Sequence, residues 1–280
     1  MVVRQYRRSP GAVVAAVAVT GLLAGTTGCT GAGVVTGQLP PADPVDAVHR
    51  AAARLVGAGT AKARTAMDMA TGGTRVTIRG EGVYDFARRL GRLRVVLPQD
   101  PTGSPRQRPI TELLAPGALY MKNRGAGVPA DKWVRVDTAS VSDGNLVTGG
   151  VTDPFAAAEL LRGARAVRYV GETRVAGTPV RHYRGTADLA RAAAVASRET
   201  RSALAAAAKG FSTREVPFDV YLDEQGRVRK VRHQFSFVNE RHADAVAVAS
   251  TTLLFGFGAP VDVRLPDAGD IYAGKIAEGA

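Results

Sequence analysis

Apolar and polar side chains alternate along the stretch from Thr74 to Phe86. Val76, Ile78, Tyr84 and Phe86 fall on one side of this stretch, and mostly charged or hydroxyl side chains fall on the other. A period of two is typical of a β-strand that has one face covered and one face in water. The pattern therefore predicts an antiparallel sheet with one apolar face.

The same alternation recurs in short segments through most of the chain. Turn residues separate these segments, most clearly at Asp223 to Gly226 inside a hairpin that runs from Val216 to Phe237. The other strands are expected at about 90–97, 110–114, 118–122, 132–137, 166–173, 178–186 and 243–257. Because about ten strands occur without a regular strand–helix–strand alternation, the pattern predicts an α+β fold with a large curved antiparallel sheet.

About three helices are expected beside this sheet. Two of them begin with an Asp-Pro pair, at Asp43 and Asp153, where the aspartate caps the helix and the proline takes its first position. The first helix has apolar residues at helical spacing up to Leu55, and the third covers the alanine-rich stretch from Ala187 to Lys209. The charged side chains of this last stretch exclude a transmembrane helix.

The first 28 residues have the layout of an export signal. Arg4, Arg7 and Arg8 precede an uncharged, mostly apolar run over residues 11–24, which is the order found in secretory signal peptides. The run is shorter than the ~20 residues that span a bilayer. We expect it to direct the chain to the outer face of the cytoplasmic membrane without remaining as an anchor.

The single cysteine, Cys29, follows this segment directly. The sequence Thr26-Thr27-Gly28-Cys29 resembles a bacterial lipobox, with a small residue before the cleavage site and Thr26 where leucine is usual. An unpaired cysteine in an exported chain calls for such an explanation, and acyl chains such as palmitate on Cys29 would anchor the protein. The alternative is ordinary cleavage between about Ala24 and Thr26, which leaves an unmodified thiol.

The signal and the cysteine divide the chain into four parts. We expect a signal peptide over residues 1–28, a flexible tether rich in glycine and proline over 29–42, one domain over 43–265, and a C-terminal tail over 266–280. The mature chain has no second cysteine and hence no internal disulfide. Packing and hydrogen bonds must therefore hold the domain together.

The chain is strongly basic. Its formal net charge is +12, and the three arginines of the signal account for part of it, which leaves +9 for the mature chain. The basic residues are spread over many strands without a nucleic-acid-binding signature; they are densest at Arg227, Arg229, Lys230 and Arg232. Acidic lipid headgroups and wall polymers are the anionic partners expected outside a membrane, and a solvated surface in an arginine-rich composition of actinobacterial type is the plain alternative.

Motifs that carry catalysis or bind metals are missing from the sequence. It has no Gly-x-Ser-x-Gly elbow, His-Glu-x-x-His helix or phosphate-binding loop. Asp219 and Asp223 lie close together in the hairpin, but aspartate is favoured at turns for structural reasons. The four histidines lack the spacing of metal ligands; they are His49, His182, His233 and His242. We expect no enzymatic activity, no cofactor and no metal.

One hairpin resembles a known family. Val216-Pro-Phe-Asp-Val-Tyr-Leu-Asp223, closed by Gly226-Arg-Val-Arg-Lys230, resembles the Pro-x-Asp-x-Trp-x-Asp…Gly hairpin of actinobacterial LppX/LprAFG-type lipoproteins, with Tyr221 in place of the tryptophan. Lys132-Trp-Val134 and the stretch from Gly171 to Gly185 fit the same order of strands, so that the resemblance covers about residues 43–265. It implies the fold of LolA-type carriers, in which a half-barrel of antiparallel strands is closed by helices over an apolar cavity.

The resemblance implies a monomeric, membrane-anchored lipoprotein that binds, and carries, acylated lipids or glycolipids in the cell envelope. An envelope transporter or a wall polymer is the further partner that it suggests. A dry, concave sheet face is the surface that an acyl chain needs. The cavity candidates are strand residues whose plain alternative role is core packing; they are Val76, Ile78, Tyr84, Phe86, Phe218, Val220, Leu222, Phe235 and Phe237. The alternative function is a non-enzymatic interaction or sensor protein with the same fold and a filled core.

Overall fold

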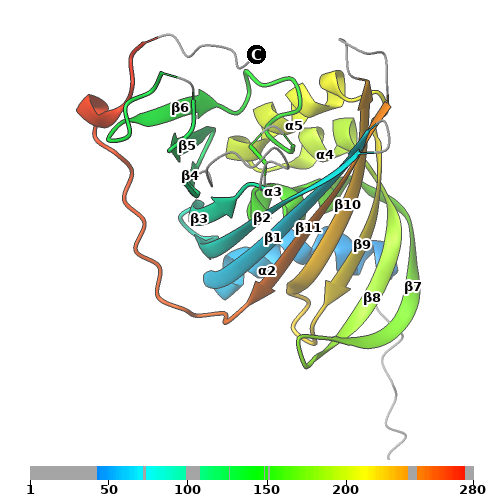
Figure 1. Ribbon diagram of the computed structural model, residues 1–280. Coiled ribbons are helices and arrows are strands. Elements are labelled where there is room, and N and C mark those ends of the chain that lie inside the picture. The colour runs from blue at the N-terminus through cyan, green and yellow to red at the C-terminus, as the bar shows by residue number, and fades with distance from the viewer. Residues whose placement is uncertain are drawn as a thin grey trace, which may run out of the picture. The chain divides into compact units, whose positions relative to one another are not determined.

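An antiparallel sheet of eleven strands forms the centre of the computed structural model (Figure 1). The structure describes residues 43–71, 74–98, 108–125, 127–147, 149–150, 152–238 and 245–274. All of them belong to one compact unit, Pro40–Ala280. Because this unit contains every described helix and strand, we expect it to fold without the segment before it. The predicted signal peptide, Cys29, the tether and His242 lie outside the described residues.

The sheet consists of two meanders that meet at a single long-range pair. Its strand order is β6-β5-β4-β3-β2-β1-β11-β10-β9-β8-β7, so that only β1 and β11 join segments distant in the chain. The bounds are β1 Thr60–Thr71, β2 Thr74–Asp85, β3 Leu90–Val96, β4 Ile110–Ala115, β5 Ala118–Lys122, β6 Trp133–Asp137, β7 Ala164–Val175, β8 Thr178–Asp188, β9 Glu215–Leu222, β10 Val228–Val238 and β11 Ala245–Phe255.

Helices cover one face of the sheet, which we call the inner face. Figure 1 shows α2, α3, α4 and α5 behind the strands. Along β1, Ala61, Ala63 and Thr65 point inward and are buried, whereas Lys62 and Arg64 point to the exposed outer face. The helix bounds are α1 Pro44–His49, α2 Ala51–Ala58, α3 Pro154–Leu160, α4 Leu189–Val195 and α5 Arg198–Gly210, with 3-10 turns at Leu161–Gly163 and Ala268–Asp270. Among the described residues, no helix is long and apolar enough to span a bilayer.

The predicted α+β fold, a curved antiparallel sheet covered by helices, is confirmed. The structure has one strand that was not expected, β1. The predicted helix over Ala187 to Lys209 has the wrong bounds. Its first two residues end β8, and the remainder divides into α4 and α5 at Ala196 and Ser197. The buried carboxylate of Glu159 accepts a hydrogen bond from the Ser197 amide at 2.5 Å, which stabilises this break.

The chain after β11 crosses to the far edge of the sheet. Figure 1 shows this segment running from the end of β11 to β6. Ile271 forms a parallel bridge with Trp133, and the Lys132 ammonium donates to the Gly269 carbonyl at 2.8 Å. The described part of the predicted tail is therefore attached to the edge strand.

Candidate functional site

The predicted cavity residues lie together on or beside the inner face. Seven of them belong to the hydrophobic core, and Val76 packs against it; the seven are Ile78, Tyr84, Phe86, Phe218, Val220, Leu222 and Phe235. The side chain of Phe237 lies outside the described residues. Phe86 connects this set to the helices, since its ring centroid lies 6.4 Å from that of Phe155 in α3. The structure thus brings the described candidates into one continuous apolar layer.

In the described part of the chain, the helices pack closely against this layer. A hollow of only about 50 Å³ lies between the sheet and the helices, lined among others by Tyr84, Leu114 and Phe155. A water molecule's share of liquid volume is ~30 Å³, so that this hollow does not hold an acyl chain. A lipid would have to move α3 and α5 away from the sheet to reach the inner face.

Four polar side chains interrupt the apolar inner face at its centre. We call Thr65, Ser250, Thr252 and His233 the inner polar patch. Thr65 in β1 stands opposite Thr252 in β11, and His233 in β10 stands opposite Ser250. Ser250 and Thr252 point to the same face because they are two residues apart on one strand. The patch therefore spans three neighbouring strands.

Most of this patch has no hydrogen-bond partner. Thr65, Thr252 and His233 are at most 4% exposed, and Thr65 Oγ1, Thr252 Oγ1 and His233 Nε2 have no partner among the described residues. Ser250 is satisfied, since its hydroxyl lies 2.6 Å from that of Thr152. A buried polar group left without a partner costs ~1–3 kcal/mol. The patch is thus a site where a polar ligand atom would be stabilised.

The charge state of the patch follows from its burial. Burial lowers the pKa of His233 to about 3, because the protonated ring would lose its hydration. The imidazole is therefore neutral near pH 7 and can donate or accept one hydrogen bond at each nitrogen, depending on its tautomer. The patch presents hydroxyl groups and a neutral ring and no net charge.

The inner face also holds a buried carboxyl group away from the patch. Glu112 in β4 is fully buried between Leu93 and Met121 of the neighbouring strands. Neither of its carboxyl oxygens has a partner among the described residues. Burial raises its pKa to about 8, and the nearby positive charge of Arg124 opposes this rise. Glu112 is therefore mostly protonated at pH 7, and the inner face is uncharged there too.

The aspartates singled out in the sequence have separate surroundings. Asp223 lies beyond the end of β9, and its carboxylate accepts from the amides of Gln225 and Arg227 at 3.1 and 2.9 Å. Asp219 lies on the outer face, where His182 Nε2 and Arg184 Nε are 2.6 and 2.7 Å from the same oxygen. Burial raises the pKa of Asp219, but the hydrogen bonds and charges of Arg184 and His182 together outweigh it and lower the pKa. The two carboxylates do not form an acid–base pair.

The inner polar patch was not predicted, although the sequence contains a signal for it. Thr65 follows Ala61 and Ala63 on the inward side of β1, and His233 stands between Val231 and Phe235 on the inward side of β10. A polar residue at an inward position of an apolar alternation is the available signal. The pairing of β11 with both β1 and β10, which brings these residues together, is not visible in the sequence. Among the described residues no group of acidic, histidine or cysteine side chains has the arrangement of a metal site.

Comparison with known proteins yields structural neighbours only. No family model matches the chain, and no curated protein matches it. The chain is similar to the lipoprotein LppX of Mycobacterium tuberculosis, with 10% identity, a TM-score of 0.45 and coverage of 79% of this chain and 98% of that one. It is similar to LprF of Mycobacterium bovis, with 12% identity, a TM-score of 0.39 and coverage of 80% and 96%.

A LolA superfamily protein of Nitrosomonas europaea is also similar, with 10% identity, a TM-score of 0.33 and coverage of 81% and 96%. These neighbours include lipoproteins of the type that the β9–β10 hairpin resembles in sequence. At these identities the likeness concerns the course of the chain alone.

Proposed function

We propose that the protein is a lipoprotein of the cell envelope that binds, and carries, an acylated lipid between the inner face of its sheet and the helices. One observation carries this proposal: a largely apolar, helix-covered face contains a buried polar patch in which Thr65 Oγ1, Thr252 Oγ1 and His233 Nε2 lack partners among the described residues. A structure selected only for a stable core would replace Thr65 and Thr252 by apolar residues of the same shape. Their retention is explained if a ligand supplies the missing partners.

An acyl ester or a glycolipid linkage has the chemistry that suits this patch. Threonine hydroxyls both donate and accept, and the neutral ring of His233 can do either. The ester or hydroxyl groups of the ligand would lie at the patch. Phe86 and Phe235 now contact Phe155 and Phe211, two aromatic residues of the covering segments. In the complex, the acyl chains of the ligand would contact Phe86 and Phe235 instead. The neutral state of Glu112 keeps the rest of the face compatible with hydrocarbon.

Binding requires the helices to move, and the contacts that hold them closed are identifiable. The Tyr84 hydroxyl donates to Asp153 at the start of α3 at 3.2 Å, and Arg89 forms a 3.0 Å ion pair with Glu199 in α5. A carrier that closes when empty keeps its apolar face out of water. Acylation of Cys29 would hold the domain near the membrane. The 13 residues from Thr30 to Ala42 would limit its distance from the membrane to about 45 Å, which is their length when fully extended.

The closed inner face favours a second function. An interaction or sensor protein of the envelope needs no internal ligand, and its core would be packed as the side chains of Tyr84, Phe86 and Phe155 are here. Neither function involves catalysis. The two differ in whether the protein purified from its host contains a lipid.

The deciding experiment is native mass spectrometry of the chain from Thr30 onward, expressed in an actinobacterial host and followed by extraction into organic solvent. We expect one lipid per protein, and we expect Thr65→Val/Thr252→Val to lose it while remaining folded. Thr173→Val is the control, because it removes an exposed hydroxyl from β7, outside both the inner face and the outer face around β1, and should retain the lipid. A lipid-free mass for the parent chain, with no uptake of added lipids or glycolipids, would leave the filled-core function.

A further inference from the structure

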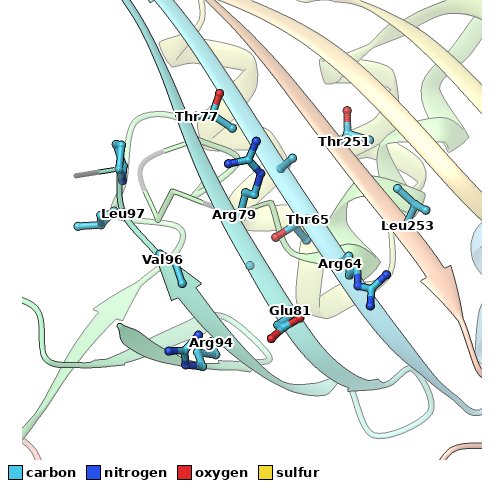
Figure 2. Close-up of a pocket in the computed structure, with 13 residues that line it drawn as sticks. Arg64, Thr65, Thr77, Arg79, Glu81, Arg94, Val96, Leu97, Thr251 and Leu253 are labelled. Carbon is cyan, nitrogen blue, oxygen red and sulfur yellow. The ribbon is translucent and has the colours of Figure 1, made fainter. Parts of the chain in front are cut away.

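The outer face of the sheet has a hollow of its own, of about 780 Å³, that crosses β11, β1, β2 and β3. We call it the outer groove and define it by six of its lining residues, Arg64, Arg79, Glu81, Arg94, Val96 and Leu253. Figure 2 shows Arg79 between the apolar side chains of Val96 and Leu253, and Glu81 between Arg64 and Arg94. The groove thus combines apolar side chains with three guanidinium groups.

The strand register brings these arginines together. Leu253, Arg64, Glu81 and Arg94 form one row across four strands, and Ala66, Arg79 and Val96 belong to the next row. Residues directly opposite each other have Cβ atoms ~4.5–5.5 Å apart, and diagonal neighbours lie within reach of long side chains. Arg64, Arg79 and Arg94 are therefore able to contact one molecule at the same time.

The positive charges of the groove exceed the negative charge that the protein places beside them. Within the described residues, no carboxylate lies within ion-pair distance of Arg64, Arg79 or Arg94. Glu81 has no ion-pair partner there either, and the four charges give the groove a net charge of +2. Two arginines of the densest basic stretch differ from these, since Arg227 and Arg229 both approach the buried carboxylate of Asp223, at 2.9 and 3.9 Å.

The geometry points to a membrane-docking groove that binds the acidic phosphate headgroup of a bilayer phospholipid. Guanidinium groups bind phosphate oxygens in a bidentate manner, and three of them surround the groove. Val96 is 44% exposed, which places an apolar side chain where the glycerol and the first methylenes of a lipid would lie. A volume of about 780 Å³ is typical of a site for one small molecule, so that the headgroup enters the groove and the acyl chains remain in the bilayer.

This groove lies on the face opposite the proposed lipid site, and neither site depends on the other. Attraction to an acidic membrane contributes on the order of fivefold in binding per basic residue near the surface. Docking through the outer face would hold the protein against the bilayer with its helices directed away from it. The groove would then add to membrane attachment whether or not Cys29 is acylated.

The test is sedimentation of the anchor-free chain from Thr30 with vesicles of phosphatidylglycerol and phosphatidylcholine, compared with vesicles of phosphatidylcholine alone. We expect binding to the acidic vesicles only. The variant Arg64→Gln/Arg79→Gln/Arg94→Gln should bind them at least tenfold more weakly. The matched control is Arg88→Gln/Arg168→Gln/Arg214→Gln, which removes the same charge from exposed positions outside the groove and should weaken binding less than threefold.

A second variant tests the groove by a gain of binding. Glu81→Gln removes the negative charge between Arg64 and Arg94, and we expect it to strengthen binding severalfold, whereas Glu172→Gln on β7 should leave binding unchanged. Equal losses in the two arginine triples would overturn the groove and leave diffuse attraction by the basic chain. Absence of binding by the parent chain would overturn it as well. The lipid content of the purified protein is a separate readout, which distinguishes failure of the groove from failure of the inner lipid site.

Discussion

At the scale of single residues, the inner face contains groups that reduce the stability of the fold. Thr65 and Thr252 each leave a hydroxyl without a partner, and Glu112 leaves a whole carboxyl group. The neighbouring inward positions on the same strands are apolar beside Thr65 and Glu112, and Leu254 is apolar beside Thr252, so that apolar side chains would fit there. Of these residues, Thr65 and Thr252 are the ones to which the proposed function gives a ligand-binding role.

Substitution of the two threonines separates stability from binding. Thr65→Val/Thr252→Val retains the shape of both side chains and removes two unpaired hydroxyls, so that we expect the free energy of unfolding to rise by about 1–3 kcal/mol. Urea unfolding followed by circular dichroism measures this change. The control Thr173→Val should alter stability by less than about 0.5 kcal/mol. A large loss of stability in the double variant would show that the hydroxyls have partners in the folded protein.

At the scale of elements, an Asp-Pro pair caps two helices, α1 and α3, but the two aspartates make different contacts with the rest of the protein. Asp43 and Asp153 both precede a proline, and both accept hydrogen bonds from the amides that follow. The sequence predicted both caps, and the structure confirms them. Only Asp153 is also tied to the sheet, through Tyr84, and sequence alone could not indicate this because the two residues are 69 positions apart.

The two caps therefore predict unequal losses. Asp43→Ala removes one exposed hydrogen bond and should cost about 1 kcal/mol or less. Asp153→Ala removes two amide partners and leaves the buried Tyr84 hydroxyl unpaired, so that we expect a loss of about 2–4 kcal/mol. Thermal and urea unfolding of the two variants measure the difference. Equal losses would mean that Asp153 acts only as a local cap and does not fasten α3 to the sheet.

A glycine marks the place where the 141–147 loop meets α5. A Cβ on Gly144 would lie 2.0 Å from the Ala203 carbonyl oxygen, and the residue has a φ of +59°. Gly144→Ala should therefore destabilise the protein by several kcal/mol, whereas Gly57→Ala, in open space within α2, should stabilise it by about 0.5–1 kcal/mol. Differential scanning calorimetry of both variants measures these shifts, and a neutral Gly144→Ala would show that the loop can move away from α5.

At the scale of the whole molecule, the division between what could and could not be predicted follows the range of the interactions. Alternation and turn residues predicted the strands of both meanders except β1, because these signals are local. The pairing of β1 with β11 joins segments more than 170 residues apart, and no local pattern encodes it. Both proposed sites depend on that pair: the inner polar patch combines β1, β10 and β11, and the outer groove combines β1, β2, β3 and β11.

Two groups in different halves of the sheet, His233 and Glu112, have pKa values shifted far enough to make the stability of the molecule depend on pH between about 4 and 8.5. The pKa of His233 is lowered from 6.5 to about 3, so that the unfolded chain binds one more proton than the folded protein between these values. Stability due to His233 is therefore complete above pH 6.5 and is lost as the pH falls. The pKa of Glu112 is raised from 4.5 to about 8, so that the folded protein holds the extra proton, and stability is lost as the pH rises above 4.5.

Together these shifts predict a plateau of stability. Between about pH 4.5 and 6.5 the two slopes cancel, because the folded and unfolded states bind the same number of protons at these groups. Above pH 6.5 only the Glu112 slope remains, and below pH 4.5 only that of His233, each at most ~1.4 kcal/mol per pH unit. The free energy of unfolding, measured in urea from pH 4 to 8.5, should fall on both sides of the plateau.

Two variants test which group causes each change. Glu112→Gln should remove the loss of stability above pH 6.5, and His233→Gln should reduce the loss of stability below pH 4.5. If the parent protein and Glu112→Gln show the same pH dependence above 6.5, the Glu112 carboxyl has a partner in solution, and the inner face is open enough to admit water at β4.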